Sequence, residues 1–153
     1  MSEPAAPLMN VDIVSADQRI FAGEARMLSL ASTTGELGIL PRHSPLVAKL
    51  KPGEVRVTLP DGNREFIYVS GGFLEVGPEG ATVLADTAQR GAEIDRAEAE
   101  AARARAEEAM EAAVLFTDRD RARAELLKAI AQIKTLEDTF REAHRHRPRK
   151  PPR

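Results

Sequence analysis

Glycine and proline are absent between Ala92 and Arg147, whereas all ten glycines and seven of the ten prolines lie at or before Gly91. These residues interrupt helices at a cost of about 1 kcal/mol for glycine and about 3 kcal/mol for proline. Their absence after Gly91 favours long helices in the second part of the chain. Their frequency before it favours short strands joined by turns.

Cysteine is also absent, which excludes disulfides, thiolate nucleophiles and cysteine metal sites and is consistent with a reducing compartment. No apolar stretch approaches the roughly 20 residues that a membrane-spanning helix needs. Residues 1–10 contain prolines and Glu3 but no apolar run, so we expect neither a signal peptide nor an anchor. We therefore expect a soluble protein that reaches a membrane only through a partner.

Apolar and polar residues alternate in the first part of the chain, for example over residues 11–13 and 55–59. The sequences PDGN at 60–63 and GPEG at 77–80 each separate two such runs, which predicts β-hairpins. We interpret Gly35 and Gly38 as a tight turn between strands. Short strands at close intervals without intervening helices predict an antiparallel sandwich or barrel.

Two helices are predicted after Gly91, the first from Ile94 to about Phe116. The second follows a break at residues 116–118, where Thr117 and Asp120 have the spacing of a capping box. One apolar stripe is predicted on each helix. The stripes are Ala99, Ala102, Ala106, Ala109, Ala113 and Phe116 on the first, and Ala122, Leu126, Ala129, Ile133, Leu136 and Phe140, with Leu127 and Ile130 beside them, on the second.

The alanine stripe allows close but weak packing, since burial contributes only about 0.8 kcal/mol per methylene. We therefore predict an antiparallel helical hairpin that can open without melting, as conformational switches do. The predicted fold is an all-β sandwich followed by a segregated α-helical hairpin. Its parts are an N-terminal extension at 1–8, the sandwich at 9–90, the hairpin at 91–143 and a basic tail at 144–153.

Charge is acidic or balanced everywhere except at the C-terminus. Residues 1–91 carry 8 basic and 11 acidic side chains, whereas 148–153 carry Arg149, Lys150 and Arg153 and no acid. The tail is expected to be disordered because it is charged and interrupted by proline. We favour a solvated tail over one that contacts nucleic acid or acidic lipid.

Motifs for catalysis, phosphate binding and calcium binding are absent. His43 is the only histidine before the tail, so a catalytic triad or a metal site lacks partners, and we expect no catalytic residue, no metal and no cofactor. A small hydrolase centred on His43 remains one alternative. A nucleic-acid-binding module is the other, and the acidic balance and few aromatic residues of the first part disfavour it.

Six short sequence blocks, spread over most of the chain, have a characteristic order and spacing. They are GELGILP (35–41), HSPL (43–46), LKPG (50–53), FIYVSGGFLEV (66–76), TVLAD (82–86) and AELLKAIAQ (124–132). Together they resemble the epsilon subunit of bacterial F-type ATP synthase, in its proteobacterial type. The resemblance covers about Val11 to about Phe140.

This resemblance implies a flattened β-sandwich with a helical hairpin, acting as a non-catalytic rotor part of a proton-translocating ATP synthase. The sandwich would contact the gamma subunit and the polar loops of the membrane c-ring, at the cytoplasmic face of the bacterial inner membrane. Glu36 would face the c-ring loops, and His43, near the same edge, would approach gamma. The residues of this contact would be Glu36, Leu37, Gly38, Ile39, Pro41, Arg42 and His43. Many relatives have glycine or asparagine in place of Arg42.

The resemblance also implies that the hairpin can rise along the shaft and block ATP hydrolysis in the catalytic head of alpha and beta subunits. Arg121, Arg123, Lys128 and Lys134 would then meet acidic residues of the beta subunit, or would form only a solvated face.

Some members of the family bind ATP at the hairpin through an Ile-Asp-x-x-Arg-Ala motif. Here Ile94 and Asp95 match this motif, Glu98 replaces its arginine, and Arg105 remains at a second matching position. A carboxylate repels phosphate where a guanidinium would bind it. We therefore predict weak or absent ATP binding.

Overall fold

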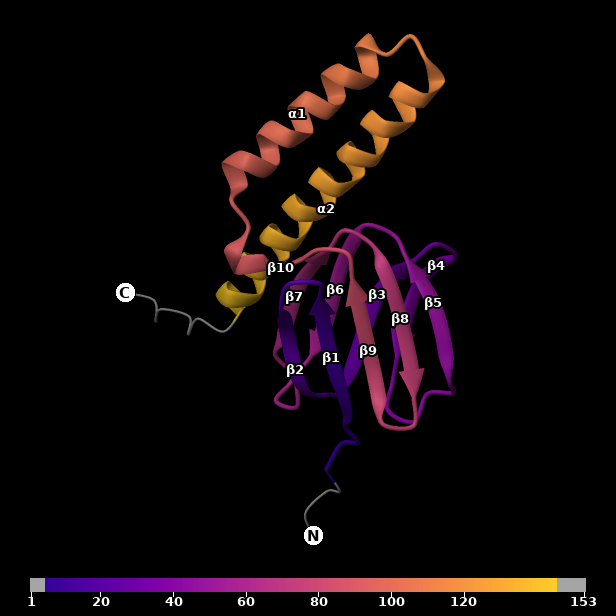
Figure 1. Cartoon of the computed structure of the whole chain (residues 1–153). Coiled ribbons are helices and arrows are strands. Elements are labelled where there is room, and N and C mark those ends of the chain that lie inside the picture. The colour runs from indigo at the N-terminus through magenta and orange to yellow at the C-terminus, as the bar shows by residue number, and fades with distance from the viewer. Residues whose placement is uncertain (1–4, 146–153) are drawn as a thin grey trace, which may run out of the picture.

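The chain folds into a β domain with a helical hairpin projecting from one end (Figure 1), as seen in a computed structural model that describes residues 5–145. The strands are β1 (Met9–Ser15), β2 (Arg19–Ala25), β3 (Met27–Ser32), β4 (Gly35–Ile39), β5 (Leu46–Leu50), β6 (Gly53–Thr58), β7 (Arg64–Val69), β8 (Gly72–Gly77), β9 (Gly80–Ala85) and β10 (Ala88–Arg90). A short 3-10 turn, η1 (Gly91–Glu93), leads into α1 (Arg96–Ala112) and α2 (Phe116–Arg145). The predicted fold class is confirmed.

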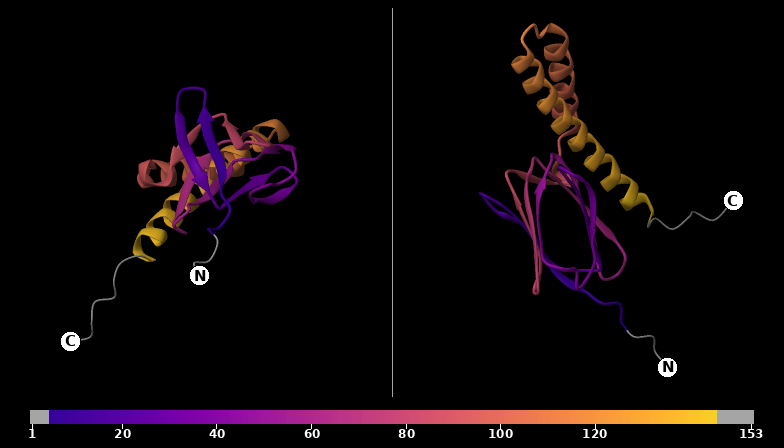
Figure 2. Two further views of the ribbon diagram at one scale, coloured as in Figure 1. Left: turned by 90° about the horizontal axis from the view of Figure 1, so that it is seen from below. Right: turned by 90° about the vertical axis from the view of Figure 1, so that its right-hand side faces the viewer.

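Within residues 5–145 the strands form one sheet in the order β10-β7-β6-β3-β5-β8-β9-β1-β2. The remaining strand, β4, pairs with β3 outside this order. Neighbouring strands are antiparallel except β1 and β9, which are parallel. Figure 2 shows this sheet curving back on itself into two layers. This curvature encloses one hydrophobic core between the layers.

The core is formed by the alternate residues that the sequence pattern predicts. Val11 and Ile13 on β1 and Val55 and Val57 on β6 are fully buried, while their polar neighbours point outward. This alternation is what a strand with one face on the core requires. The predicted turn at 60–63 joins β6 to β7, and the turn at 77–80 joins β8 to β9.

The interpretation of Gly35 and Gly38 as a turn is wrong, because both lie in β4, opposite Ser32 and Ser29 of β3. The turn consists instead of Thr33 and Thr34. The Ser32 hydroxyl stabilises it by donating to the Gly35 carbonyl (2.7 Å) and accepting from the Thr34 amide (3.2 Å). Short hydroxyl side chains form such local turns readily.

The break between the helices lies three residues earlier than predicted. Ala113 is already extended, and α2 begins at Phe116. The capping box is also wrong, because the Arg119 amide donates to the Leu115 carbonyl (3.1 Å), so helical bonding starts before Thr117. At the other end α2 includes His144 and Arg145, which the predicted tail contained. Residues 146–153 lie outside the described part.

The seam between α1 and α2 is built from alanine on the α1 side, where Ala99 and Ala106 are the buried residues. On α2, Ala122, Ala129 and Leu136 face it from the predicted stripe. The ends of the stripes differ from prediction, since Phe116 is 77% and Phe140 53% exposed. Towards the tip the helices enclose an open groove of about 500 Å³.

A second face of α2, which the apolar stripe does not predict, packs on the sandwich. Ala131 and Thr135 are buried there, and they lie on the side of α2 that meets β6 and β7. Close approach is possible because Gly91 has no side chain, and a Cβ at that position would overlap the Thr139 hydroxyl. The helical hairpin is thus anchored by the C-terminal half of α2 (Figures 1 and 2).

Candidate functional site

The predicted contact residues occupy β4 and the turn that follows it, and they are not equally accessible. Glu36 and Gly38 are exposed, Leu37 is half-buried, and Ile39 is fully buried opposite Leu28. Ile39 therefore belongs to the core and can support a contact only by holding the strand. The Glu36 side chain is the one charged group that β4 offers to a partner.

The turn after β4 has a left-handed residue at its third position. The His43 amide donates to the Leu40 carbonyl (3.1 Å), with Pro41 and Arg42 between them. Arg42 has φ 67°, and proline followed by a residue of positive φ is typical of a type II turn, which favours glycine or asparagine at that position. This geometry explains why glycine or asparagine suits the position of Arg42.

His43 is exposed at the end of this turn. Its Nδ1 donates to the Ser44 carbonyl (2.7 Å). Within residues 5–145 it has no contact with a carboxylate or a nucleophile, and no cluster of three or more His, Asp or Glu side chains could hold a metal ion there. The geometry gives the hydrolase alternative no support.

Glu36 and His43 lie at opposite ends of β4. Glu36 borders a groove of about 290 Å³ that it shares with Lys51 and with Leu127 and Ile130 of α2. His43 borders a different groove, of about 420 Å³, beside Leu8 and the β8–β9 turn. The expected contact is therefore one sheet edge with two separate ends.

The four basic residues expected to act on α2 differ in their contacts. Arg121 and Arg123 are exposed in the outer half of the helix, and neither forms an ion pair with another described residue. Lys128 pairs with Glu125 (3.4 Å). Lys134 is held at the sandwich, where it contacts Glu54 (3.3 Å).

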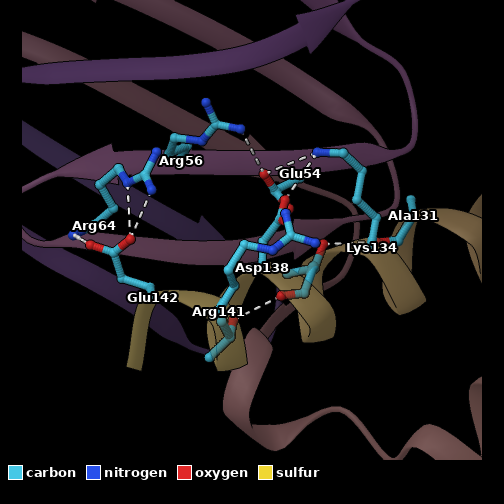
Figure 3. Close-up of polar contacts among 10 residues, drawn as sticks. Glu54, Arg56, Arg64, Ala131, Lys134, Asp138, Arg141 and Glu142 are labelled. Atoms are coloured by element: carbon cyan, nitrogen blue, oxygen red, sulfur yellow. Dashed lines mark hydrogen bonds and ion pairs between the residues drawn. The ribbon is translucent and has the colours of Figure 1, made fainter. Parts of the chain in front are cut away.

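One end of the α2 contact with the sandwich is an ion pair between Glu142 and Arg64 of β7 (Figure 3). The guanidinium donates from Nη2 (2.8 Å) and Nε (3.1 Å) to Oε2, and the Arg64 amide donates to Oε1 (3.2 Å). Burial alone would raise the pKa of Glu142, but these bonds from Arg64 outweigh it and lower the pKa.

The other end of this contact brings two carboxyl groups together (Figure 3). The Glu54 side chain on β6 is 6% exposed, and its Oε1 accepts from Lys134 (3.3 Å) and Arg56 (3.3 Å). Lys134 also donates to Asp138 (3.2 Å), to which Arg141 donates as well (3.1 Å). Burial, together with the adjacent Asp138 carboxyl, raises the pKa of Glu54 to about 7.

These docking residues were missed by sequence reasoning. On α2 they are Ala131, Thr135, Asp138 and Glu142, at spacings of four, three and four, which is the pattern of one helix face. Because the residues of this face are small or polar rather than large and apolar, hydrophobic periodicity does not reveal it. The spacing itself was the available signal.

Two of the residues matched to the ATP-binding motif, Ile94 and Asp95, have structural roles at the base of the hairpin. Asp95 caps α1 by accepting from the Glu98 amide (3.0 Å), as a helix N-terminus favours. Ile94 is buried in a small cluster with Tyr68. Arg105 lines the groove between the helices together with Arg121. Weak or absent ATP binding stays a prediction.

Neither helix in the described range combines the length and the apolar character needed to cross a bilayer.

Comparison with known families and proteins gives consistent matches. Residues 8–91 match the family described as ATP synthase, Delta/Epsilon chain, beta-sandwich domain. The ATP synthase epsilon chain of Nitrosococcus oceani is 55% identical over 132 residues, covering 86% of this chain and 94% of that protein. The epsilon chain of Alkalilimnicola ehrlichii is 50% identical over 137 residues, covering 90% of this chain and 98% of its own length.

Solved structures show the same fold at low sequence identity. A chain in the cryo-EM structure of the Euglena gracilis mitochondrial ATP synthase, described as OSCP/F1/c-ring in rotational state 1, superposes with a TM-score of 0.74 at 21% identity. The match covers 92% of this chain and 84% of that one. A chain of the Tetrahymena thermophila mitochondrial enzyme, described as central stalk/c-ring, gives a TM-score of 0.56 at 13% identity, covering 84% of this chain and 96% of that one.

Proposed function

Because this chain belongs to the ATP synthase epsilon-chain family, we propose that it is a non-catalytic rotor subunit of a bacterial proton-translocating ATP synthase. In this role the sandwich connects the gamma subunit to the c-ring, and the helical hairpin restrains ATP hydrolysis. The subunit lies at the cytoplasmic face of the inner membrane, as a peripheral part of the complex. It needs no cofactor of its own.

The β4 edge is suited to the coupling role. It presents the Glu36 carboxylate at one end and the exposed Arg42 and His43 at the other. The two ends border separate grooves, so one rigid edge can hold two partners at once. In this proposal the Glu36 end meets the c-ring loops and the His43 end meets gamma.

The observation that carries the regulatory role is the separation of the two hydrophobic clusters. Among residues 5–145, the main core lies within the sandwich, whereas the second cluster consists of Tyr68, Ile94, Ala99, Ala131, Ile133 and Leu136. The α1 side of the helical seam is alanine, and the contact of α2 with the sandwich ends in ion pairs. The hairpin can therefore detach while the sandwich core stays intact.

A raised α2 would present its outer half to the catalytic head. Arg121 and Arg123 are exposed there, and cations on a helix are attracted to an acidic surface over about 8 Å at physiological ionic strength. Lys134 would join them only after leaving Glu54 of the sandwich. The inhibited state thus competes with the docked state for the same lysine.

Deletion of residues 92–153 in the assembled ATP synthase tests this function. We expect ATP hydrolysis to rise, because the restraining helices are gone, while the truncated subunit still co-purifies with the complex. The Glu108→Gln variant, changed at an exposed site of α1, is the control and should leave hydrolysis unchanged. If the truncated subunit assembles and hydrolysis stays at the parent level, the inhibitory role is wrong.

A further inference from the structure

The contact between α2 and β6 contains a pair of carboxyl groups that share one lysine (Figure 3). We call Glu54, Lys134 and Asp138 the acid pair with its bridging lysine. The Lys134 ammonium lies 3.3 Å from Glu54 Oε1 and 3.2 Å from Asp138 Oδ2. Glu54 belongs to the sandwich and the other two to α2, so this cluster exists only while the helix is docked.

One oxygen of this cluster lacks a hydrogen-bond donor. Glu54 Oε2 is buried and accepts no hydrogen bond from the residues of the described chain. A buried acceptor without a donor is costly, and the neighbouring Asp138 carboxylate offers only further acceptors. A proton on Glu54 removes this cost, because a protonated carboxyl can donate to Asp138.

The other charged groups around Glu54 act in both directions. Arg56 on β6 and Lys134 on α2 stabilise its ionised form, and Arg141 does the same for Asp138. Glu36 and Lys51 line the adjoining groove with opposite charges. Tyr68, opposite Glu54 on β7, is buried. Burial and the Asp138 carboxyl raise the pKa of Glu54, and Lys134 lowers it. The first two effects are larger, so the pKa is raised to about 7.

We propose that the acid pair is a proton-sensitive latch for the helical hairpin. Glu54 holds a proton and donates it in a hydrogen bond to Asp138 while α2 is docked. When Glu54 loses this proton, its buried carboxylate and the half-buried carboxylate of Asp138 face each other across one lysine, and α2 leaves the sandwich more readily. Acidification therefore holds the hairpin down, and a rise of pH releases it.

The pH range follows from the two directions of the pKa shifts. Glu54 has its pKa raised to about 7 in the docked state, from an ordinary value of 4.5. Its contribution to docking is therefore complete below its ordinary pKa and is lost as pH rises through about 7. Asp138 and Glu142 have lowered pKa values, so their contributions are lost in acid. Docking is strongest at about pH 5 to 6, between these limits.

The full-length isolated chain allows a direct test, because it contains no cysteine that would compete for labels. Nitroxides on Ala124→Cys and Lys49→Cys, both exposed, report the distance from α2 to the sandwich by pulsed electron paramagnetic resonance. We expect the ratio of open to docked molecules to rise about tenfold between pH 6 and pH 8. In Glu54→Gln, which keeps a donor towards Asp138 but cannot ionise, this rise should disappear.

Glu108→Gln, on an exposed part of α1, is the matched control and should keep the full pH response. A carbon-13 NMR titration of the Glu54 carboxyl is the second measurement and should show a midpoint near 7. The proposal is overturned if Glu54 titrates near its ordinary pKa, if the open population does not rise by pH 8, or if Glu54→Gln responds like the parent.

The latch deepens the proposed function, since it names what releases the hairpin, but the two can fail separately. If the isolated chain opens with pH while truncation leaves ATP hydrolysis unchanged, the latch stands and the inhibitory role fails. If truncation raises hydrolysis while docking does not depend on pH, the inhibitory role stands and the latch fails.

Discussion

At the scale of single residues, Arg42 has a backbone conformation that its side chain disfavours. Among the described residues it is the non-glycine residue with positive φ, at 67°. A left-handed conformation costs an ordinary residue about 1 to 2 kcal/mol, through the clash of Cβ with the following carbonyl oxygen. The strain of Arg42 lies in the turn that precedes His43. Strained residues of this kind are common at functional sites.

Replacing Arg42 by glycine should stabilise the chain by about 0.5 to 1 kcal/mol, because the strain is relieved while the unfolded chain gains some freedom. Chemical denaturation of the isolated chain measures this change. Ser44→Gly is the control in the same loop, where φ is not positive, and it should destabilise the chain slightly. An Arg42→Gly variant less stable than the parent would show that the side chain has a contact worth more than the strain.

Asp95 and Glu54 show what the sequence can reveal about a single carboxylate. Asp95 directly precedes α1 and caps it. This was predictable because its partner is three residues away. Glu54 meets Lys134, eighty residues further along the chain, so no local pattern marked it as unusual.

At the scale of elements, the alanine seam of the helical hairpin is the feature that composition predicted best. Its buried residues on α1 are alanines, and the open groove near the tip is lined by further ones, Ala102 and Ala109 among them. Alanine side chains are too short to fill this space. The outer half of the hairpin is therefore held mainly by the intrinsic stability of each helix.

Leucine at Ala102 and Ala109 should fill the groove and strengthen the association of the helices by about 1 to 2 kcal/mol. Nitroxides on Ala101→Cys and Ala124→Cys would then report a smaller fraction of separated helices. Ala104→Leu, on an exposed side of α1, is the control and should change nothing. Ala106 is left unchanged because it is already buried, and a larger side chain there would overpack. Helices that separate as often as in the parent would contradict the weak-seam hypothesis.

The elements that were misplaced have a common physical cause. The glycines of β4 were assigned to a turn because glycine favours turns, but pairing with β3 draws residues 35–39 into the sheet. The second face of α2 was missed because its residues gain their burial from β6 and β7 rather than from apolar side chains of their own. In both cases a tertiary contact overrode a local preference.

At the scale of the whole molecule, the position of Glu36 between the sandwich and α2 links the two proposed roles. Glu36 shares its groove with Leu127 and Ile130 of the docked helix. A partner bound to Glu36 would therefore lie close to the hairpin. In the proposed mechanism, movement of α2 would change the surroundings of the coupling contact as well as those of the catalytic head.

Reversing the charge at Glu36 should weaken coupling, because the carboxylate is the charge that β4 presents to the c-ring in the proposed assembly. In membranes that contain ATP synthase with the Glu36→Lys subunit, we expect several-fold less proton pumping per ATP hydrolysed. Quenching of a pH-sensitive dye measures the pumping. Asp86→Lys, at another exposed acid, should pump like the parent. Unchanged pumping in Glu36→Lys would remove Glu36 from the coupling contact.

The division into strands before Gly91 and helices after it follows from the sequence alone, because alternation, helical period and the placement of glycine and proline act between neighbours in the chain. The family follows from it too, since matching blocks extend over most of its length. Only the tertiary structure decided that β1 pairs in parallel with β9, that α2 docks on β6 and β7, and that Glu54 meets Asp138. These contacts join residues far apart in the chain, and their energies depend on burial that no local segment possesses before folding.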